Sequence, residues 1–200
     1  MRKNLFYAFL HMLGRFILWA FFRLEKSGRE NIPLKGGVIL ASNHASFLDP
    51  ILVASASPRQ LYFLARESLF RGFFFPLLIK SLNAIPFPRS APSPRTFRKV
   101  SELLKKGAAI LLFPEGTRSR NGRIAEGRPG VAMLSFLTRT PVVPTLIQGS
   151  FQALPPGKKM ISPVKIRVIF GEPIYPEGEA TRENYRKFTH LIMERIRSLG

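Results

Sequence analysis

Short apolar runs alternate with amphipathic segments along most of this chain. The runs predict strands near residues 38–42, 61–65, 84–87, 108–113, 142–147 and 164–170, and the amphipathic segments predict helices near 47–57, 68–80, 94–106, 129–139 and 181–198. Strands that alternate with helices are typical of a parallel sheet with crossover helices. We therefore predict an α/β fold, with a mostly parallel central sheet that is flanked by helices and closed by an antiparallel or edge strand.

The composition limits what the protein can bind and how it can react. The chain has 200 residues, of which 46% are hydrophobic, enough for one domain with a sizeable core. It has no cysteine, which excludes disulfides, thiolate metal sites and a cysteine nucleophile. The net charge of +19 attracts polyanions, which include nucleic acid, an anionic membrane surface and phosphorylated substrates.

The distribution of phenylalanine along the chain distinguishes between nucleic acid and a membrane surface as the partner. Nine of the 18 Phe residues cluster in the apolar stretches 5–22 and 69–79. In a groove that binds single-stranded nucleic acid, aromatic side chains would instead be interleaved with basic ones. We therefore expect an anionic membrane surface as a partner, and no nucleic acid.

The N-terminal stretch Leu5–Phe22 is apolar, but His11 and Arg15 interrupt it. On a helix these two polar side chains lie about 40° apart, so they form one narrow stripe beside a broad apolar arc. That pattern is typical of a helix lying in the membrane interface, and an internal arginine makes a membrane-spanning helix costly. We expect residues 1–27 to form a membrane-associated N-terminal helix and residues 28–200 to form the globular domain. A buried core helix is the alternative.

His44 and Asp49 lie five positions apart, just after the apolar run 38–41. On one continuous helix they would point about 140° apart, but a strand-to-helix turn lets the carboxylate reach back to the ring. A carboxylate on one ring nitrogen fixes the tautomer and makes the other nitrogen a better base. The alternative is a solvated loop histidine beside an aspartate at a helix N-terminus. Ser46 lacks the Gly-x-Ser-x-Gly pattern of a serine nucleophile, so we interpret it as the helix N-cap.

Three further segments accompany this pair. Ile85–Arg89 (IPFPR), Phe113–Ser119 (FPEGTRS) and Val142–Thr145 (VVPT) follow it along the chain. In this order and spacing the chain resembles the glycerolipid (lysophospholipid) acyltransferase family, which includes the 1-acyl-sn-glycerol-3-phosphate acyltransferases. That family carries an NHxxxxD block, a block ending in Arg, an FPEGTRS block and a Val-Pro block. The chain departs from the pattern at Asn83, where Gly is expected, and at Arg128, where Lys is usual.

The resemblance implies a glycerol-3-phosphate acyltransferase-like fold for the domain over residues 28–200. It also implies transfer of a fatty acyl group from acyl-CoA or acyl carrier protein to the sn-2 hydroxyl of lysophosphatidic acid, forming phosphatidic acid in phospholipid biosynthesis. His44 would act as the general base, and Asp49 would hold its ring. We expect the protein at the cytoplasmic face of the cell membrane, as a peripheral or monotopic protein.

The other residues of these blocks are candidates for substrate binding. Arg89 and Arg118 fit a phosphate clamp, because a guanidinium group matches phosphate oxygens in two-point contact. The resemblance assigns both arginines to the phosphate of the acceptor. We expect Glu115 to orient Arg118 or the acceptor's free hydroxyl, Gly116 to let the backbone approach the substrate, and Thr117 to add a hydrogen bond.

We expect no metal and no cofactor besides the thioester co-substrate, because the sequence shows no cluster of His and carboxylates with metal-ligand spacing. Two alternatives stay open. The same machinery would serve an acyltransferase for a different lysolipid acceptor. A non-catalytic basic protein that docks on membrane or nucleic acid would explain the charge, but it would have no use for the base.

Overall fold

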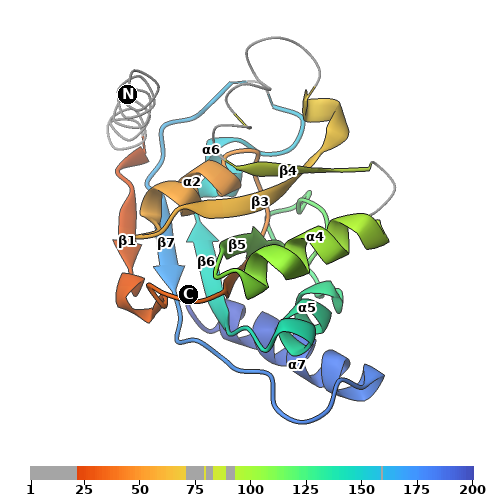
Figure 1. Ribbon diagram of the computed structural model, residues 1–200. Coiled ribbons are helices and arrows are strands. Elements are labelled where there is room, and N and C mark those ends of the chain that lie inside the picture. Colours follow the sequence, from red (N-terminus) through yellow and green to blue (C-terminus); the bar gives the residue numbers. More distant parts are fainter. Residues whose placement is uncertain (1–21, 71–78, 80–82, 89–92, 159) are drawn as a thin grey trace, which may run out of the picture.

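The computed structural model describes residues 22–70, 79, 83–88, 93–158 and 160–200 (Figure 1). Most of the predicted N-terminal helix lies outside the described residues, as does most of the predicted helix 68–80. The described start of the latter is a 3₁₀ helix, η2 (Glu67–Phe70). No helix in the described parts of the chain has the length and apolar character needed to cross a bilayer.

A seven-stranded sheet forms the centre of the molecule, in the order β1-β7-β6-β2-β5-β3-β4. The strands are β1 (Glu25–Ser27), β2 (Val38–Ser42), β3 (Leu61–Arg66), β4 (Ala84–Phe87), β5 (Ala109–Leu112), β6 (Val142–Gln148) and β7 (Arg167–Phe170). All neighbouring pairs are parallel except β6 and β7. The predicted mostly parallel sheet is therefore confirmed, and β7, with β1 parallel to it at the edge, runs antiparallel to the other five strands.

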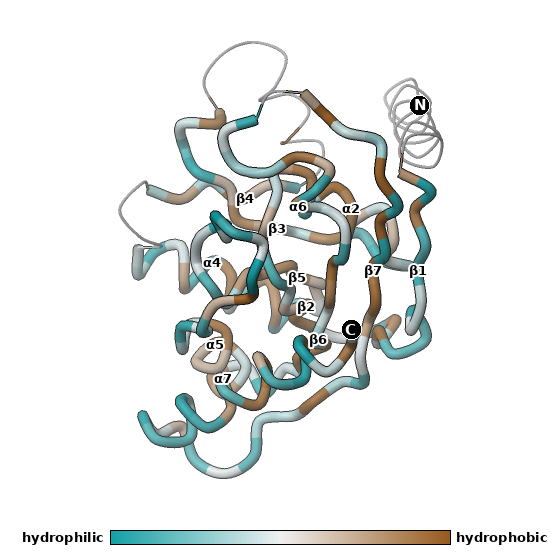
Figure 2. The backbone as a smooth tube through the Cα atoms, turned by 180° about the vertical axis from the view of Figure 1, so that it is seen from behind, coloured by the Kyte–Doolittle hydropathy of each residue, from teal (hydrophilic) through white to brown (hydrophobic). Residues whose placement is uncertain are grey.

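Helices cover both faces of the sheet (Figures 1 and 2). They are α2 (Asp49–Ala56), α4 (Pro94–Lys105), α5 (Gly130–Thr138), α6 (Ser150–Ala153) and α7 (Arg182–Arg197), together with the short 3₁₀ helix η1 (Arg29–Asn31). One cluster of buried residues joins the sheet to α2 and α6, and a second joins its other face to α4, α5 and α7. The prediction that helices flank the sheet is thus confirmed, and four of the five predicted helices are present as α2, α4, α5 and α7.

Strand β2 shows why the strands of this sheet correspond to continuous apolar runs in the sequence. All of its residues are buried. Val38 and Leu40 belong to the α2 cluster, whereas Ile39 and Ala41 belong to the α4 cluster. A strand that is covered on both faces has no polar face to alternate with, and burial of each large side chain contributes about 1.5–3 kcal/mol.

The first described residues do not continue a helix up to residue 27, where we expected the N-terminal segment to end. Glu25–Ser27 pairs in parallel with β7, and Glu25 forms ion pairs with Lys165 (2.8 Å) and Arg167 (3.0 Å). The sheet therefore begins within the predicted segment. Sequence periodicity missed this strand because it is short and exposed, and its partner is distant in sequence.

Asn83, the departure from the family pattern before β4, adopts a left-handed conformation with φ of 58°. Glycine is favoured in this region of backbone space, and asparagine tolerates it better than most other residues do. The chain therefore has a left-handed turn before β4, a conformation that suits the glycine expected at this position, and asparagine adopts it here.

Candidate active site

The first and third sequence blocks meet because they leave neighbouring parallel strands at the same edge of the sheet. Ala41 of β2 is paired with Leu112 of β5, and each strand ends within a residue of this pair. The loops that follow are joined by the backbone N–H of Ser119, which donates to the carbonyl of His44 at 2.7 Å. Ligand sites of parallel α/β sheets lie at such carboxyl ends of strands.

His44 and Asp49 form the contact that their spacing predicts. The Nδ1 atom of His44 lies 2.8 Å from Oδ2 of Asp49, whose side chain is fully buried. The same carboxylate oxygen accepts the backbone N–H groups of Ala45 and Ser46, both at 2.7 Å. Because the carboxylate holds the proton on Nδ1, it leaves Nε2 as the ring nitrogen that can accept a proton. The His44 side chain is 18% exposed, so solvent and substrate can reach it.

Phe113 restrains the plane of the His44 ring. Its aromatic ring stacks on the His44 imidazole with the centroids 3.9 Å apart and the planes 15° from parallel. The imidazole is therefore held at its edge by a carboxylate and on its face by an aromatic ring. We had not predicted this role. The available signal was the position of Phe113, directly after β5 and at the start of the FPEGTRS block.

Asn43 anchors the start of the same loop. Its side-chain amide donates to the carbonyl of Ile147 at 3.0 Å, and its amide oxygen accepts the N–H of Ile147 at 2.8 Å. The buried side chain thus pairs with β6 as a strand backbone would. This pairing fixes the residue before His44 with two hydrogen bonds inside the core.

The interpretation of Ser46 as a helix N-cap was wrong. Helix α2 begins at Asp49, and Leu48 occupies the N-cap position without a side-chain cap. The Ser46 hydroxyl donates to the carbonyl of Leu154 at 2.9 Å and accepts the N–H of Leu48 at 3.2 Å. A tight turn separates Ser46 from the start of α2, so its hydroxyl cannot cap that helix. The hydroxyl instead ties the loop to the end of α6.

Both carboxylate oxygens of Glu115 accept backbone N–H groups. Oε1 accepts from His44 at 2.8 Å and Oε2 accepts from Ala125 at 2.9 Å, and the residue is only 4% exposed. We had expected Glu115 to orient Arg118 or the acceptor's hydroxyl. In the structure it instead joins the His44 loop to the loop that follows its own block.

Gly116 and Thr117 are exposed at the surface of this loop. Gly116 has φ of 71°, and a Cβ atom on it would lie 3.2 Å from Cδ and Nε of Arg128. Backbone conformation and close packing therefore both favour glycine here. The close approach is to the side chain of Arg128, the residue that replaces the family's usual lysine.

Arg118 is partly buried beside the His44 loop. Its Cζ atom lies 3.4 Å from the centroid of the Phe47 ring, and its Nη1 atom is buried without a hydrogen-bond partner. Burial lowers the pKa of Arg118 from its ordinary value, the charge of Arg66 lowers it further, and the carboxylate of Asp49 raises it. A buried N–H group without a partner, next to a second positive charge, is a favourable place for an anion.

Arg66 is a candidate that we had not predicted from the sequence. It is the last residue of β3, which pairs with β5, so it lies at the same edge of the sheet as the FPEGTRS loop. A basic residue at a predicted strand end was the available signal. Arg89, which we had predicted as the other half of the phosphate clamp, lies outside the described residues, and its role stays a prediction.

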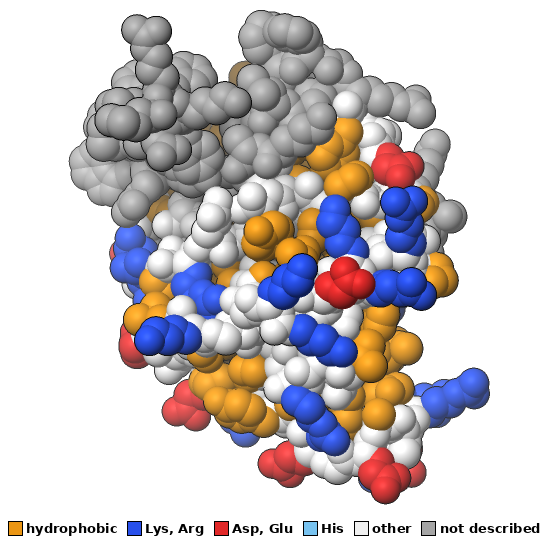
Figure 3. Space-filling view, in the orientation of Figure 1, with side chains coloured by type: hydrophobic (Ala, Val, Ile, Leu, Met, Phe, Trp, Pro, Cys, Tyr) orange, Lys and Arg blue, Asp and Glu red, His pale blue; other side chains and the backbone are white. Residues whose placement is uncertain are grey.

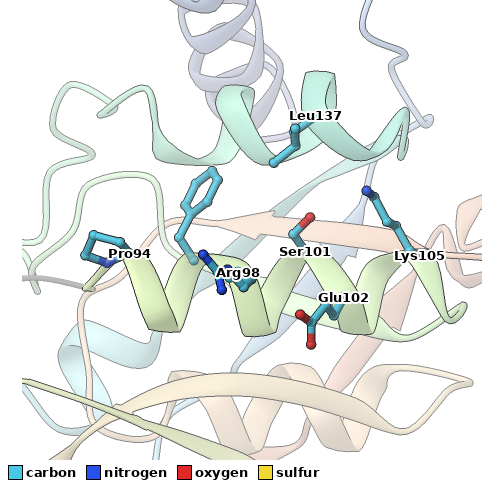
Figure 4. Close-up of a pocket in the computed structure, with 7 residues that line it drawn as sticks. Pro94, Arg98, Ser101, Glu102, Lys105 and Leu137 are labelled. Atoms are coloured by element: carbon cyan, nitrogen blue, oxygen red, sulfur yellow. The ribbon is translucent and has the colours of Figure 1, made fainter.

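A groove elsewhere on the surface contains none of these residues. It lies between α4 and α5, with a volume of about 470 Å³, and Arg98, Lys105 and Leu137 are among its lining side chains (Figure 4). Its walls are helical surface outside the sequence blocks, whereas the base and the arginines gather where strands end. The His44 loop is therefore the candidate active site.

The comparisons with known proteins agree with this geometry. A family model described as Acyltransferase matches residues 23–148. The protein named 1-acyl-sn-glycerol-3-phosphate acyltransferase of Bacillus subtilis is 27% identical, with 86% of this chain and 85% of that protein covered. A protein of the same name from Pseudomonas aeruginosa is 33% identical, with 84% and 67% covered. The chain spans about half of a longer chloroplast relative from Brassica napus, 51% of whose length is covered.

A solved structure shares the fold as well. The crystal structure of the 1-acyl-sn-glycerophosphate (LPA) acyltransferase PlsC from Thermotoga maritima superposes with a TM-score of 0.79 at 29% identity, covering 96% of this chain and 79% of that one. The family model includes the His44 loop and the FPEGTRS block. The predicted resemblance is confirmed, and the chain belongs to the acyltransferase family.

Proposed function

We propose that this acyltransferase moves a fatty acyl group from acyl-CoA or acyl carrier protein to the sn-2 hydroxyl of lysophosphatidic acid, forming phosphatidic acid. The observation that carries the proposal is the His44–Asp49 pair beside Arg118, whose buried Nη1 has no partner. A base is needed to take the proton of the acceptor hydroxyl, and N–H groups without another partner are needed to bind the acceptor's phosphate. The names of the relatives from Bacillus subtilis and Pseudomonas aeruginosa support the same acceptor.

The reaction follows from the tautomer that Asp49 imposes. Nε2 of His44 takes the proton of the acceptor hydroxyl as its oxygen attacks the thioester carbonyl. The tetrahedral intermediate then expels the thiolate, which receives that proton from the imidazolium. Asp49 stabilises the positive charge that the ring carries between these steps. General acid–base catalysis of this kind is typically worth about 10²–10⁴-fold in rate.

Arg118 would bind the phosphate of the acceptor through the edge of its guanidinium group. Arg66 adds positive charge beside it, and the charges of the two arginines act on each other. Two such groups would neutralise a phosphate monoester better than one, because at neutral pH it carries close to two negative charges. Arg89 is retained as a third phosphate ligand in this proposal.

We place the enzyme at the cytoplasmic face of the cell membrane, as a peripheral or monotopic protein. The apolar N-terminal stretch Leu5–Phe22 and the net charge of +19 support this location, since anionic lipids attract basic surfaces. Lys and Arg side chains are spread over the face shown in Figure 3. The acceptor itself is also a lipid of the membrane.

An acceptor panel tests the proposed substrate. Purified enzyme is given lysophosphatidic acid, lysophosphatidylcholine or monoacylglycerol, each with acyl-CoA and with acyl carrier protein as donor. We expect kcat/KM for lysophosphatidic acid to exceed that for monoacylglycerol by roughly 10–150-fold, the value of one charge-assisted hydrogen bond, and Arg118→Ala to remove most of this preference. Equal turnover of all acceptors would show that the phosphate is not recognised and would favour another lysolipid.

A further inference from the structure

Phe47 is a large aromatic residue that the protein leaves half exposed next to its active site. It lies in the loop between His44 and Asp49 and is 52% exposed. Burial of a phenylalanine side chain is favourable, so core packing does not explain why about half of this one stays exposed. The face of its ring is occupied by Arg118, with Cζ 3.4 Å from the ring centroid.

Arg118 has few other restraints. Within the described residues no hydrogen bond holds its guanidinium group, and its Nη1 atom is buried without a partner. The positive charge of Arg66 repels it, whereas the charge of Asp49 attracts it. A free arginine side chain has many rotamers, and each one must be given up when the phosphate binds. Contact with an aromatic ring is a way to select one of them beforehand.

We infer that Phe47 is a positioning residue for acceptor recognition: its ring holds the Arg118 guanidinium flat, so that the edge of that group faces the phosphate. This inference rests on the proposed function of Arg118. The two contacts are compatible because a cation–π contact uses the face of the guanidinium plane, whereas a two-point phosphate contact uses its edge.

The position of Phe47 in the chain links the phosphate anchor to the base. Its ring belongs to the same loop as His44 and Asp49, so the loop sets the distance between the anchor and Nε2. The backbone of that loop is held by Oδ2 of Asp49, which accepts the N–H groups of Ala45 and Ser46. Since these bonds do not involve the ring, a smaller side chain at Phe47 should leave the base in place.

The test compares Phe47→Leu, which stays apolar but loses the ring, with Phe47→Tyr, which keeps it. We expect Phe47→Leu to raise KM for lysophosphatidic acid by roughly 2–30-fold, as loss of a cation–π contact predicts, with kcat unchanged within about 2-fold. Phe47→Tyr should keep the KM of the wild type. Leu137→Ala is the matched control, because Leu137 is 53% exposed on α5, outside the sequence blocks, and its loss should change neither constant.

A measurement without substrate separates this inference from the proposed function. In the NMR spectrum of the wild type, the side-chain protons of Arg118 should show ring-current shifts that Phe47→Leu removes and Phe47→Tyr retains. Absence of these shifts overturns the inference, as does an unchanged KM in Phe47→Leu or a Phe47→Tyr variant as impaired as the leucine one. If the wild type shows the shifts but does not acylate lysophosphatidic acid, the proposed acceptor fails and the role of Phe47 in phosphate recognition fails with it, leaving only the contact.

Discussion

The carboxylate of Glu115 accepts the backbone N–H of His44 at 2.8 Å, although the two residues are separated by 71 positions in the chain. Its other oxygen accepts the N–H of Ala125 at 2.9 Å. In return, the N–H of Ser119 reaches the carbonyl of His44. The backbone of His44, the proposed base, is thus held at its N–H and at its carbonyl by the FPEGTRS block.

Replacing Glu115 with glutamine tests this arrangement. The amide keeps the size of the carboxylate, but its NH₂ group must face one of the two backbone donors. We expect kcat to fall about 10-fold with KM for lysophosphatidic acid nearly unchanged, and the thermal midpoint to fall by roughly 3–12 °C, since a buried charge-assisted bond is worth about 1.5–3 kcal/mol. Steady-state kinetics and a thermal melt measure both effects. A rise in KM alone would instead indicate that Glu115 binds the acceptor.

Asp49→Asn separates the charge of the carboxylate from its shape. Oδ2 contacts Nδ1 of His44 and also accepts the N–H groups of Ala45 and Ser46, so an amide oxygen in its place keeps all three contacts. The variant then lacks only the negative charge that stabilises the imidazolium. We expect kcat to fall roughly 10²–10⁴-fold while KM stays close to that of the wild type. Single-turnover kinetics on the folded variant measure this. A loss smaller than about 10-fold would mean that Asp49 serves only the fold.

Arg66→Ala should weaken acceptor binding without removing the base. We expect KM for lysophosphatidic acid to rise roughly 3–30-fold, and activity to depend less steeply on salt, because one positive charge near the phosphate is lost. Arg66→Lys should restore part of the lost acceptor binding, since lysine keeps the positive charge but cannot make the two-point contact of a guanidinium group. Arg98→Ala, in the groove between α4 and α5, is the control for general loss of charge. Equal effects of the two alanine variants would contradict a specific role for Arg66.

Gly28 and Gly36 allow a matched test of backbone packing. Both have positive φ, 70° and 76°, but a Cβ atom on Gly28 would lie 1.9 Å from the carbonyl oxygen of Phe170, whereas nothing lies within 4 Å of one on Gly36. We expect Gly36→Ala to cost about 1–2 kcal/mol, the strain of the left-handed conformation alone, and Gly28→Ala clearly more. Chemical denaturation measures the difference. Equal free energies of unfolding would show that β7 moves freely away from residue 28.

The sequence was sufficient to predict the features that depend on local pattern. Buried strands such as β2 and β5 appear as continuous apolar runs, and parallel pairing then brings the ends of the strands together. The contact between His44 and Asp49 follows from a turn between strand and helix, which local spacing can indicate. The confirmed sheet and the observed contact are both consequences of these patterns.

What could not be predicted depends on contacts between distant loops. Nothing near Glu115 in the sequence indicates that its oxygens accept N–H groups from His44 and Ala125. The hydroxyl of Ser46 likewise bonds to Leu154, which packs beside it only in the folded protein. Strand β1 was missed for a similar reason, because three exposed residues carry no periodicity and owe their conformation to the edge of β7.

The most direct test of the account is the rate of acyl transfer to lysophosphatidic acid by His44→Ala, compared with the wild type at saturating thioester. The account predicts that kcat falls by roughly 10²–10⁴-fold while the thermal midpoint and binding to anionic vesicles stay unchanged. A His44→Ala variant that forms phosphatidic acid at the rate of the wild type would contradict it.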